Sequence, residues 1–349
     1  MDLIENKPLA PFTTFAIGGP ARWFVEAASE DEIVEAADWA RGQSLPLFVL
    51  GGGSNLLVAD AGFNGLVLKI ALRGIAALPG PSGQTIYQAA AGEDFDHCVQ
   101  QSIEDGCAGL ECLAGIPGTV GGTPVQNVGA YGQEVATVIE RVRAYDLTVR
   151  AFVEFAAAEC GFSYRHSRFN TADRGRYIVT RVDYRLVPGG APTLRYVDLQ
   201  RAFVGIEPTL VEVAAEVRRL RQTKGMLLVE GDPNCLSAGS FFKNPVVGEE
   251  QYRQIAGASP QPPPRFPAGP AQVKIPAAWL IEQAGFAKGY RLGAAAVSAH
   301  HTLALINLGA SEGRSATAAE ILALAAQITT AVQARFGLQL EMEPVRLGF

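Results

Sequence analysis

The feature that most constrains the fold is a run of three glycines between two short apolar segments. Leu47 to Leu50 precede it and Leu56 to Val58 follow it. The run itself consists of Gly51, Gly52, Gly53, Ser54 and Asn55. A strand that opens into a loop without side chains turns successive backbone N–H groups toward one point, which makes a nest for an anion such as phosphate. An ordinary turn explains three glycines equally well, so the run alone predicts either a turn or a phosphate loop.

Two common phosphate-binding motifs do not match this loop. A P-loop would continue into Gly-Lys-Ser or Gly-Lys-Thr, and a Rossmann fingerprint would add a third spaced glycine and open a helix. The residues after Asn55 are Leu-Leu-Val, which is an apolar run with strand character. The loop is therefore a phosphate loop of another type, or a turn.

Composition places the chain among globular proteins with a sizeable core. Its 349 residues are enough for two or three domains. Of these residues 48% are hydrophobic and 18% are charged, as in globular proteins. The formal net charge of −6 argues against general nucleic-acid binding but is compatible with a local basic pocket for a phosphorylated ligand. No apolar run reaches the roughly 20 residues that span a bilayer, and the N-terminus lacks the pattern of a signal peptide.

The cysteines and histidines predict a reducing compartment and no metal centre. The cysteines are odd in number and form no C-x-x-C pair, which is typical of reduced, mostly buried thiols in a cytoplasmic protein. The histidines lack metal-ligand spacing with cysteines or acidic residues. The histidines are His97, His166, His300 and His301, and the cysteines are Cys98, Cys107, Cys112, Cys160 and Cys235.

Patterns in the first half predict strands with interspersed short helices. Residues 65–70 and 177–182 have the apolar and β-branched content of strands. Residues 29–41 indicate a helix, because Ser29 can cap it and apolar residues follow at partial helical spacing. This mixture favours an α+β domain over a regular βαβ series.

The second half predicts one compact α+β domain. Helices are expected at 208–224, 276–284 and 315–335, and a strand at 302–307. The first of these helices ends in a dense group of cations, which suits a helix C-terminus and which we assign mostly to a solvated face. The cations are Arg218, Arg219, Arg221 and Lys224. Residues 257–270 are proline-rich and predict an exposed loop.

A second glycine-rich run, residues 114–132, is denser in small residues than the first. Such a run permits close approach of the backbone to a flat ligand, or tight crossings of strands. Two glycine-rich loops about sixty residues apart in one α+β domain fit a bulky cofactor with phosphates and a planar ring.

Five segments together resemble the UDP-N-acetylenolpyruvoylglucosamine reductase (MurB) family, in its longer-loop, type I branch. They are residues 13–21 (TTFAIGGPA), 51–55 (GGGSN), 115–122 (GIPGTVGG), 239–245 (GSFFKNP) and 274–281 (KIPAAWLI). The resemblance extends from about residue 6 to residue 346. The GSFFKNP element is its specific part, since other FAD enzymes of this fold share only the glycine loops.

The resemblance implies a fold and a reaction. The fold is an α+β FAD-binding domain of the PCMH/MurB type, with an N-terminal α/β subdomain and a β-rich subdomain, followed by a smaller α+β substrate-binding domain. We expect the first subdomain at 1–70, completed by 337–349, the second at 71–205, and the substrate domain at 225–335. The reaction is NADPH-dependent reduction of the enolpyruvyl ether of UDP-N-acetylglucosamine through non-covalent FAD, a step of peptidoglycan precursor synthesis in the bacterial cytoplasm.

The resemblance also implies three catalytic residues. Ser240 matches the family's proton-donating serine, and Arg165 matches its catalytic arginine, whose planar guanidinium suits a carboxylate that gains charge. Glu343 matches the catalytic carboxylate when the C-terminal segment is counted from Leu340. Glu341 stays an alternative, because alternation along a strand would place both carboxylates on one face.

Ligand-binding residues are implied in the same way. For the substrate they are Tyr196, as a lid, Lys224 and Asn244 near the uridine diphosphate, and His301, for which an ordinary strand-edge role is equally compatible. For FAD they are Gly51, Gly52, Gly53, Ser54, Asn55, Gly115, Ile116, Pro117, Gly118, Gly121, Gly122, Asn127, Gly129, Ala130 and Tyr131. No nucleic-acid partner is expected.

Two other functions stay open at this stage. An FAD-linked oxidase of the same cofactor fold would often tether its flavin through a histidine near the first glycine loop, and no histidine precedes His97. A non-catalytic flavin- or nucleotide-binding protein would explain the glycine loops. It would leave Arg165, Ser240 and Glu343 without a reason to occur together.

Overall fold

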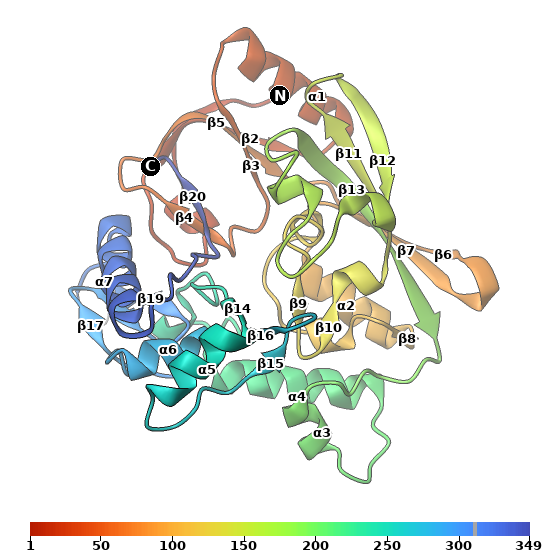
Figure 1. The fold of residues 1–349 in the computed structure, drawn as a ribbon. Helices are drawn as coiled ribbons and strands as arrows, with labels where there is room; N and C mark the ends of the chain where they lie inside the picture. The colour runs from red at the N-terminus through yellow and green to blue at the C-terminus, as the bar shows by residue number, and fades with distance from the viewer. Residues whose placement is uncertain (310–312) are drawn as a thin grey trace. The chain divides into compact units, whose positions relative to one another are not determined.

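The computed structural model describes residues 1–309 and 313–349 (Figure 1). These residues form two compact units. The first unit comprises Met1–Lys7, Ala21–Gly53 and Asn64–Gln222, and the second comprises Pro8–Pro20, Ser54–Phe63 and Thr223–Phe349. Each unit has its own apolar core, built from its own segments of the chain.

The first unit carries most of the sheet structure. Its strands are β1 (Ile4–Pro8), β2 (Pro20–Ala27), β3 (Leu47–Leu50), β5 (Phe63–Ile70), β6 (Ile75–Pro79), β7 (Thr85–Ala90), β8 (Cys107–Ala108), β9 (Gly129–Ala130), β10 (Gln133–Glu134), β11 (Ile139–Asp146), β12 (Ala151–Ala156) and β13 (Tyr177–Pro188). Its helices are α1 (Glu30–Gly42), α2 (Phe95–Glu104), α3 (Val197–Ala202) and α4 (Leu210–Thr223). The predicted strands at 65–70 and 177–182 and the predicted helices at 29–41 and 208–224 are thereby confirmed.

Two sheets organise this unit. In one the strands run in the order β1-β2-β5-β3, and β3 is parallel to β5. In the other the order is β12-β11-β13-β7-β6, with antiparallel pairing between neighbours, and β8 also pairs with β13. Strand β3 leads directly into the first glycine loop, so its pairing with β5 fixes where that loop begins.

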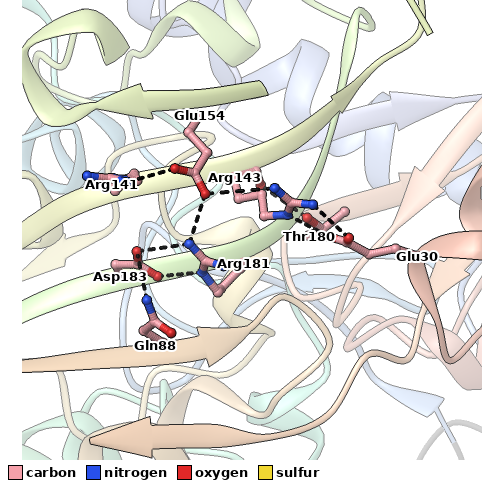
Figure 2. A network of polar contacts seen from close by, with 8 residues as sticks. All are labelled: Glu30, Gln88, Arg141, Arg143, Glu154, Thr180, Arg181 and Asp183. Atoms are coloured by element: carbon pink, nitrogen blue, oxygen red, sulfur yellow. Dashed lines mark hydrogen bonds and ion pairs between the residues drawn. The ribbon is translucent and has the colours of Figure 1, made fainter. Parts of the chain in front are cut away.

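A network of ion pairs joins helix α1 to the second of these sheets (Figure 2). Arg143 on β11 donates to both carboxylate oxygens of Glu30, at 2.9 and 3.0 Å, and this contact is the main reason that the pKa of Glu30 is lowered. Glu154 on β12 accepts from Arg141 at 2.7 Å and from Arg181 at 3.0 Å. These side chains are about a third exposed, and Arg141 about half, so each pair is screened and contributes at most about 1 kcal/mol. The Glu30–Arg143 pair joins α1 to β11, and the Glu154 pairs link β12 to β11 and β13.

The second unit is built from short strands and three packed helices. Its strands are β4 (Leu56–Val58), β14 (Val246–Gly248), β15 (Phe266–Pro267), β16 (Gln272–Lys274), β17 (Arg291–Leu292), β18 (Ala295–Val297), β19 (Leu305–Asn307) and β20 (Val345–Leu347). Its helices are α5 (Glu249–Gly257), α6 (Ala277–Gln283) and α7 (Ala318–Phe336). Near the C-terminus, β20 pairs in parallel with β4, the strand that leaves the first glycine loop.

Local sequence signals explain where the helices of this unit begin and end. Helix α7 starts after Thr317, which forms a capping box with Glu320, and the carboxylate of Asp60 accepts the N–H groups of Ala318 and Ala319 at 2.7 and 3.0 Å. It ends at Gly337, whose φ of 66° is left-handed. The predicted helices at 276–284 and 315–335 are confirmed.

Two expectations for this half need correction. The strand predicted at 302–307 begins only at Leu305, because the N–H of Leu303 donates to His301 Nδ1 and closes a turn there. The proline-rich segment 257–270 is not wholly exposed, since Pro263 is buried and its carbonyl accepts the hydroxyl of Tyr252 at 2.8 Å. Among the described residues no helix is both long and apolar enough to cross a membrane.

Candidate active site

The two glycine-rich runs meet within the first unit. A Cβ built on Gly52 would lie 2.5 Å from the Cα of Gly118, and one built on Gly51 would lie 2.7 Å from Oγ1 of Thr119. Real Cβ atoms do not approach backbone so closely, so only glycine fits at Gly52. Gly118 itself has a φ of 122°, which favours glycine. The structure thus brings together two loops that are about sixty residues apart in the sequence.

Several backbone groups of the second run are already used within the protein. The N–H of Gly121 donates to the carbonyl of Ala91, and that of Gly122 to the carbonyl of Thr119. The N–H of Gly115 donates to the carboxylate of Asp96 at 2.6 Å. These glycines therefore shape the run and are not spare donors for a phosphate.

Arg221 is a supporting residue that the sequence analysis missed. It was grouped with cations assigned mostly to a solvated face, but it is buried, and its Nε donates to the carbonyl of Gly115 at 3.0 Å. Burial lowers the pKa of this guanidinium, and the charge of Asp96 acts in the opposite direction. Arg218 donates to Asp96 at 2.6 Å, so the N–H of Gly115 bonds to a paired carboxylate and its carbonyl bonds to a buried guanidinium. A signal was present, because Arg221 lies four residues after the buried Val217 on the same helix face.

A short hairpin, β9–β10, fixes the predicted catalytic arginine. Nη2 of Arg165 donates to the carbonyl of Gly129 at 3.1 Å. The amide of the buried Asn127 donates to the carbonyl of Ser163 at 3.1 Å and to the carboxylate of Glu134 at 3.0 Å. Asn127 thus links the second glycine-rich run to the loop that bears Arg165, and its side chain serves protein contacts rather than an open site.

The predicted cofactor residue Tyr131 and the predicted substrate residue Tyr196 are in contact. Their ring centroids lie 5.1 Å apart and the ring planes are at 81°, an edge-to-face arrangement. Burial raises the pKa of Tyr131 to about 12. Ile116, Pro117 and Ala130 lie in the same runs and are half-buried.

In the second unit the structure brings Ser240 and Glu343 onto neighbouring segments. Phe242 pairs with Met342 in an antiparallel bridge, and the N–H of Glu343 donates to the carbonyl of Phe241 at 2.9 Å. Asn55, at the end of the first glycine loop, donates through its side chain to the carbonyl of Glu343 at 3.3 Å. The segments that carry Ser240 and Glu343 therefore lie side by side, and the end of the loop bonds to the second of them.

The same pairing distinguishes the two candidate carboxylates. Glu341 forms an ion pair with Lys243 at 2.5 Å, and its side chain is 67% exposed. Glu343 is half-buried, and its main chain is fixed at both the N–H and the carbonyl. A solvated, paired carboxylate is a poor choice for chemistry, so the geometry favours Glu343.

Two lysines, Lys224 and Lys288, lie near His301. Burial, together with the charges of Lys224 and Lys288, lowers the pKa of His301 to about 4. Its Nδ1 accepts the N–H of Leu303 at 3.1 Å, so the neutral ring carries its proton on Nε2 and can donate to a ligand. Lys288 was not predicted from the sequence, where a lone lysine carries no signal. Asn244 accepts the N–H of Ala277 at 2.8 Å, which orients its amide.

Comparison with known families divides the chain in a similar way. Residues 21–149 match a family described as an FAD binding domain, and they contain both glycine-rich runs. Residues 232–347 match the C-terminal domain of UDP-N-acetylenolpyruvoylglucosamine reductase, and they contain Ser240 and Glu343.

Similar proteins cover the whole chain. The UDP-N-acetylenolpyruvoylglucosamine reductase of Streptomyces coelicolor is 45% identical over 99% of this chain and 90% of its own length. That of Thermobifida fusca is 40% identical over 99% of this chain and 98% of its own. The crystal structure of the reductase from Thermus caldophilus matches with a TM-score of 0.67 and 28% identity, over 99% of this chain and 98% of that one. The chain therefore belongs to the UDP-N-acetylenolpyruvoylglucosamine reductase family.

Proposed function

We propose that this protein uses FAD and NADPH to reduce the enolpyruvyl ether of UDP-N-acetylglucosamine to UDP-N-acetylmuramate. Family membership supports the reaction, and one observation carries it at the level of residues. The antiparallel pairing of Phe242 with Met342 brings the segment of Ser240 alongside the segment of Glu343, to which Asn55 is also bonded. A simple flavin-binding protein would not need a hydroxyl and a carboxylate at the end of its cofactor loop.

The first unit fits a bound FAD. Its two glycine-rich runs pack backbone against backbone at Gly52 and Gly118, which leaves no side chains between the loops to obstruct a phosphate chain. We assign Gly51 to Asn55 to the pyrophosphate, and Gly115 to Gly118 with the hairpin residues Gly129 to Tyr131 to the remainder of the cofactor. When bound, FAD supplies the hydride transfer between NADPH and the substrate.

The second unit supplies cations for a diphosphate. Lys224 and Lys288 lie close enough to His301 for their charges to lower its pKa, so two cationic side chains are available there to an anion. We assign Lys224, Lys288 and His301 to the diphosphate of the sugar nucleotide, and Asn244 to a neighbouring polar group. Tyr196 is assigned to the substrate as a lid residue.

The roles of the three catalytic residues follow from the charges that the reaction creates. Hydride addition to the double bond places negative charge on the substrate carboxylate, and the guanidinium of Arg165 stabilises it by paired hydrogen bonds. Ser240 donates a proton to the carbon next to that carboxylate. Glu343 lies on the segment paired with that of Ser240 and orients the proton donor.

An anaerobic absorbance titration tests the reaction. Purified protein should be yellow, NADPH should bleach its flavin absorbance, and the enolpyruvyl sugar nucleotide should restore it. Ser240→Ala should spare the first step and suppress the second at least about a hundredfold, which corresponds to a typical contribution of proton transfer. If both steps fell equally, the proton-donor role would be wrong, and a colourless protein that takes up no FAD would refute the reaction.

The cellular setting is also a proposal. UDP-linked sugars and NADPH are substrates of the bacterial cytoplasm, and the five cysteines are free and buried, which fits a reducing compartment. An FAD-linked oxidase is a weaker candidate, because its chemistry has no use for the pairing of Ser240 with Glu343.

A further inference from the structure

Glu111 is a fully buried carboxylate in the first unit. It begins the short turn Glu111–Leu113, and its exposed fraction is 0%. It accepts the N–H of Gly109 at 2.8 Å, the N–H of Thr193 at 2.7 Å and Nε2 of Gln133 at 3.1 Å. Burial of a carboxylate is costly unless such donors surround it, so this arrangement is a built feature of the site.

The contacts around Glu111 converge on Thr193. Nε2 of Gln133 also donates to Oγ1 of Thr193 at 3.3 Å, and Sγ of Cys112 donates to the carbonyl of Thr193 at 3.1 Å. Oε1 of Gln133 accepts the N–H of Cys112 at 2.9 Å. The N–H, the hydroxyl and the carbonyl of Thr193 are thus all held from one side.

Thr193 begins the segment that ends at Tyr196. At the far end of this segment the Tyr196 ring packs edge-to-face on Tyr131. A Cβ built on Gly132 would lie 2.8 Å from the Cβ of Arg195, so the tip of the β9–β10 hairpin fits closely against the segment. Residues 193–196 are therefore fixed at one end by the Glu111 network and at the other by the hairpin.

The hairpin also receives Arg165, through the carbonyl of Gly129. Gln133 lies on β10 of this hairpin and bonds directly to Glu111. One buried carboxylate therefore contacts both the strand that faces Gly129 and the segment that leads to Tyr196.

We propose that Glu111 is a positioning residue for substrate binding, which sets the relation between Tyr196 and the hairpin that holds Arg165. This proposal rests on the proposed function, since Tyr196 and Arg165 are substrate residues only there. A glutamine at position 111 would direct its N–H₂ group at one or more of the N–H donors that Glu111 now accepts, so at least one of these hydrogen bonds would be lost. The 193–196 segment would then be less firmly held at Thr193.

The test compares Glu111→Gln with the wild-type holoenzyme. In stopped-flow measurements the variant should raise the KM for the enolpyruvyl sugar nucleotide by about tenfold, the factor that corresponds to the loss of one buried hydrogen bond. The limiting rate of flavin reduction at saturating NADPH should stay within about twofold. Backbone hydrogen exchange should accelerate at 193–197 and stay unchanged in β3 and β5. The matched control is Glu104→Gln, an exposed carboxylate at the end of α2, which should alter none of these quantities.

A milder pair of variants decides the question if Glu111→Gln does not fold. Thr193→Val removes the hydroxyl that Gln133 contacts and should raise the KM by about threefold, whereas Thr193→Ser keeps the hydroxyl and should retain the wild-type KM. The proposal is overturned if folded Glu111→Gln has an unchanged KM, or if KM, FAD retention and flavin reduction all deteriorate together, which would mark a general structural role. Absence of turnover in the wild type would instead refute the proposed function.

Discussion

The contact between the two glycine runs predicts that a single methyl group will disturb the cofactor site. Gly52→Ala adds a Cβ that would lie 2.5 Å from the Cα and 2.9 Å from the carbonyl carbon of Gly118. Carbon atoms in favourable contact are about 3.5–4.0 Å apart, so the loops must separate by about 1 Å. Because the neighbour is backbone, no side-chain rotation can relieve the overlap.

The cost of this overlap is expected to appear mainly in FAD affinity. Overpacking a close contact costs about 1–3 kcal/mol. If the loops must return to their original separation to bind FAD, the free energy of FAD binding falls by this amount. The dissociation constant for FAD should then rise by about 5- to 150-fold. The remainder should lower the melting temperature of the apoprotein.

The assay is titration of the apoprotein with FAD, followed by flavin fluorescence, together with thermal unfolding. The matched control is Gly42→Ala in the last turn of α1, where a new Cβ would meet nothing within 4 Å. Alanine favours helix over glycine by up to about 1 kcal/mol, so this variant should be slightly more stable and should bind FAD normally.

Two results would refute this reasoning. Wild-type FAD affinity together with a wild-type melting temperature in Gly52→Ala would mean that the loops do not touch as described. A lower melting temperature with unchanged affinity would mean that the loops touch but do not hold the cofactor.

Three more predictions concern the second unit. Glu343→Gln should slow substrate reduction by at least about tenfold in steady-state assays. Glu341→Gln should change it by less than about twofold, because Glu341 is exposed and its pair with Lys243 is a surface pair. Comparable losses in the two variants would contradict the assignment of Glu343. The folded pKa of His301, about 4, lies below its unfolded value near 6.5, so the unfolded chain takes up a proton between these limits and stability should fall as the pH drops through this window. Urea midpoints at pH 7.5 and 4.5 should show a smaller fall in His301→Gln, and an equal fall would exclude the effect. Thr14→Val removes a hydroxyl that contacts the carbonyls of Ser237 at 2.5 Å and Ser54 at 3.4 Å, so unfolding free energy should drop by about 1 kcal/mol and substrate reduction should slow, while Thr14→Ser should restore both.

Features with a local physical cause could be predicted from the sequence. Helix α1 was predicted from its cap Ser29 and from apolar spacing, and helix α7 from apolar spacing, and both were placed to within a few residues. The glycine run at 51–53 could be recognised as a turn or a phosphate loop, because a loop without side chains is typical of these two structures. The shortened strand β19 was misjudged, since the turn at His301 depends on a side-chain acceptor that hydrophobic pattern does not register.

Features that depend on distant partners could not be predicted. Arg221 and Lys224 look alike in the sequence, yet one is buried against Gly115 and the other lies among the cations near His301. The same applies to Glu111, because two of its three donors, Gln133 and Thr193, come from other parts of the chain. A charged residue resembles a surface residue until its partner is known, because burial of charge is rare without pairing.

Several buried or half-buried polar side chains share one task, which is to satisfy backbone groups of turns and loops. Asp96 and Arg221 bond to the N–H and the carbonyl of the Gly115 peptide. Glu111 accepts the N–H of Gly109 in its own turn and the N–H of Thr193 in the segment before Tyr196. The side chain of Asn307 donates to the carbonyl of Phe15 and accepts the N–H of Ala316. Buried N–H and C=O groups must be paired, and a loop that approaches a cofactor cannot pair with a neighbouring strand. A long polar side chain supplies the missing partner and makes such a loop as fixed as a strand. The placement of the predicted binding segments therefore depends on these polar residues, and substitutions at them should alter binding before they alter the fold.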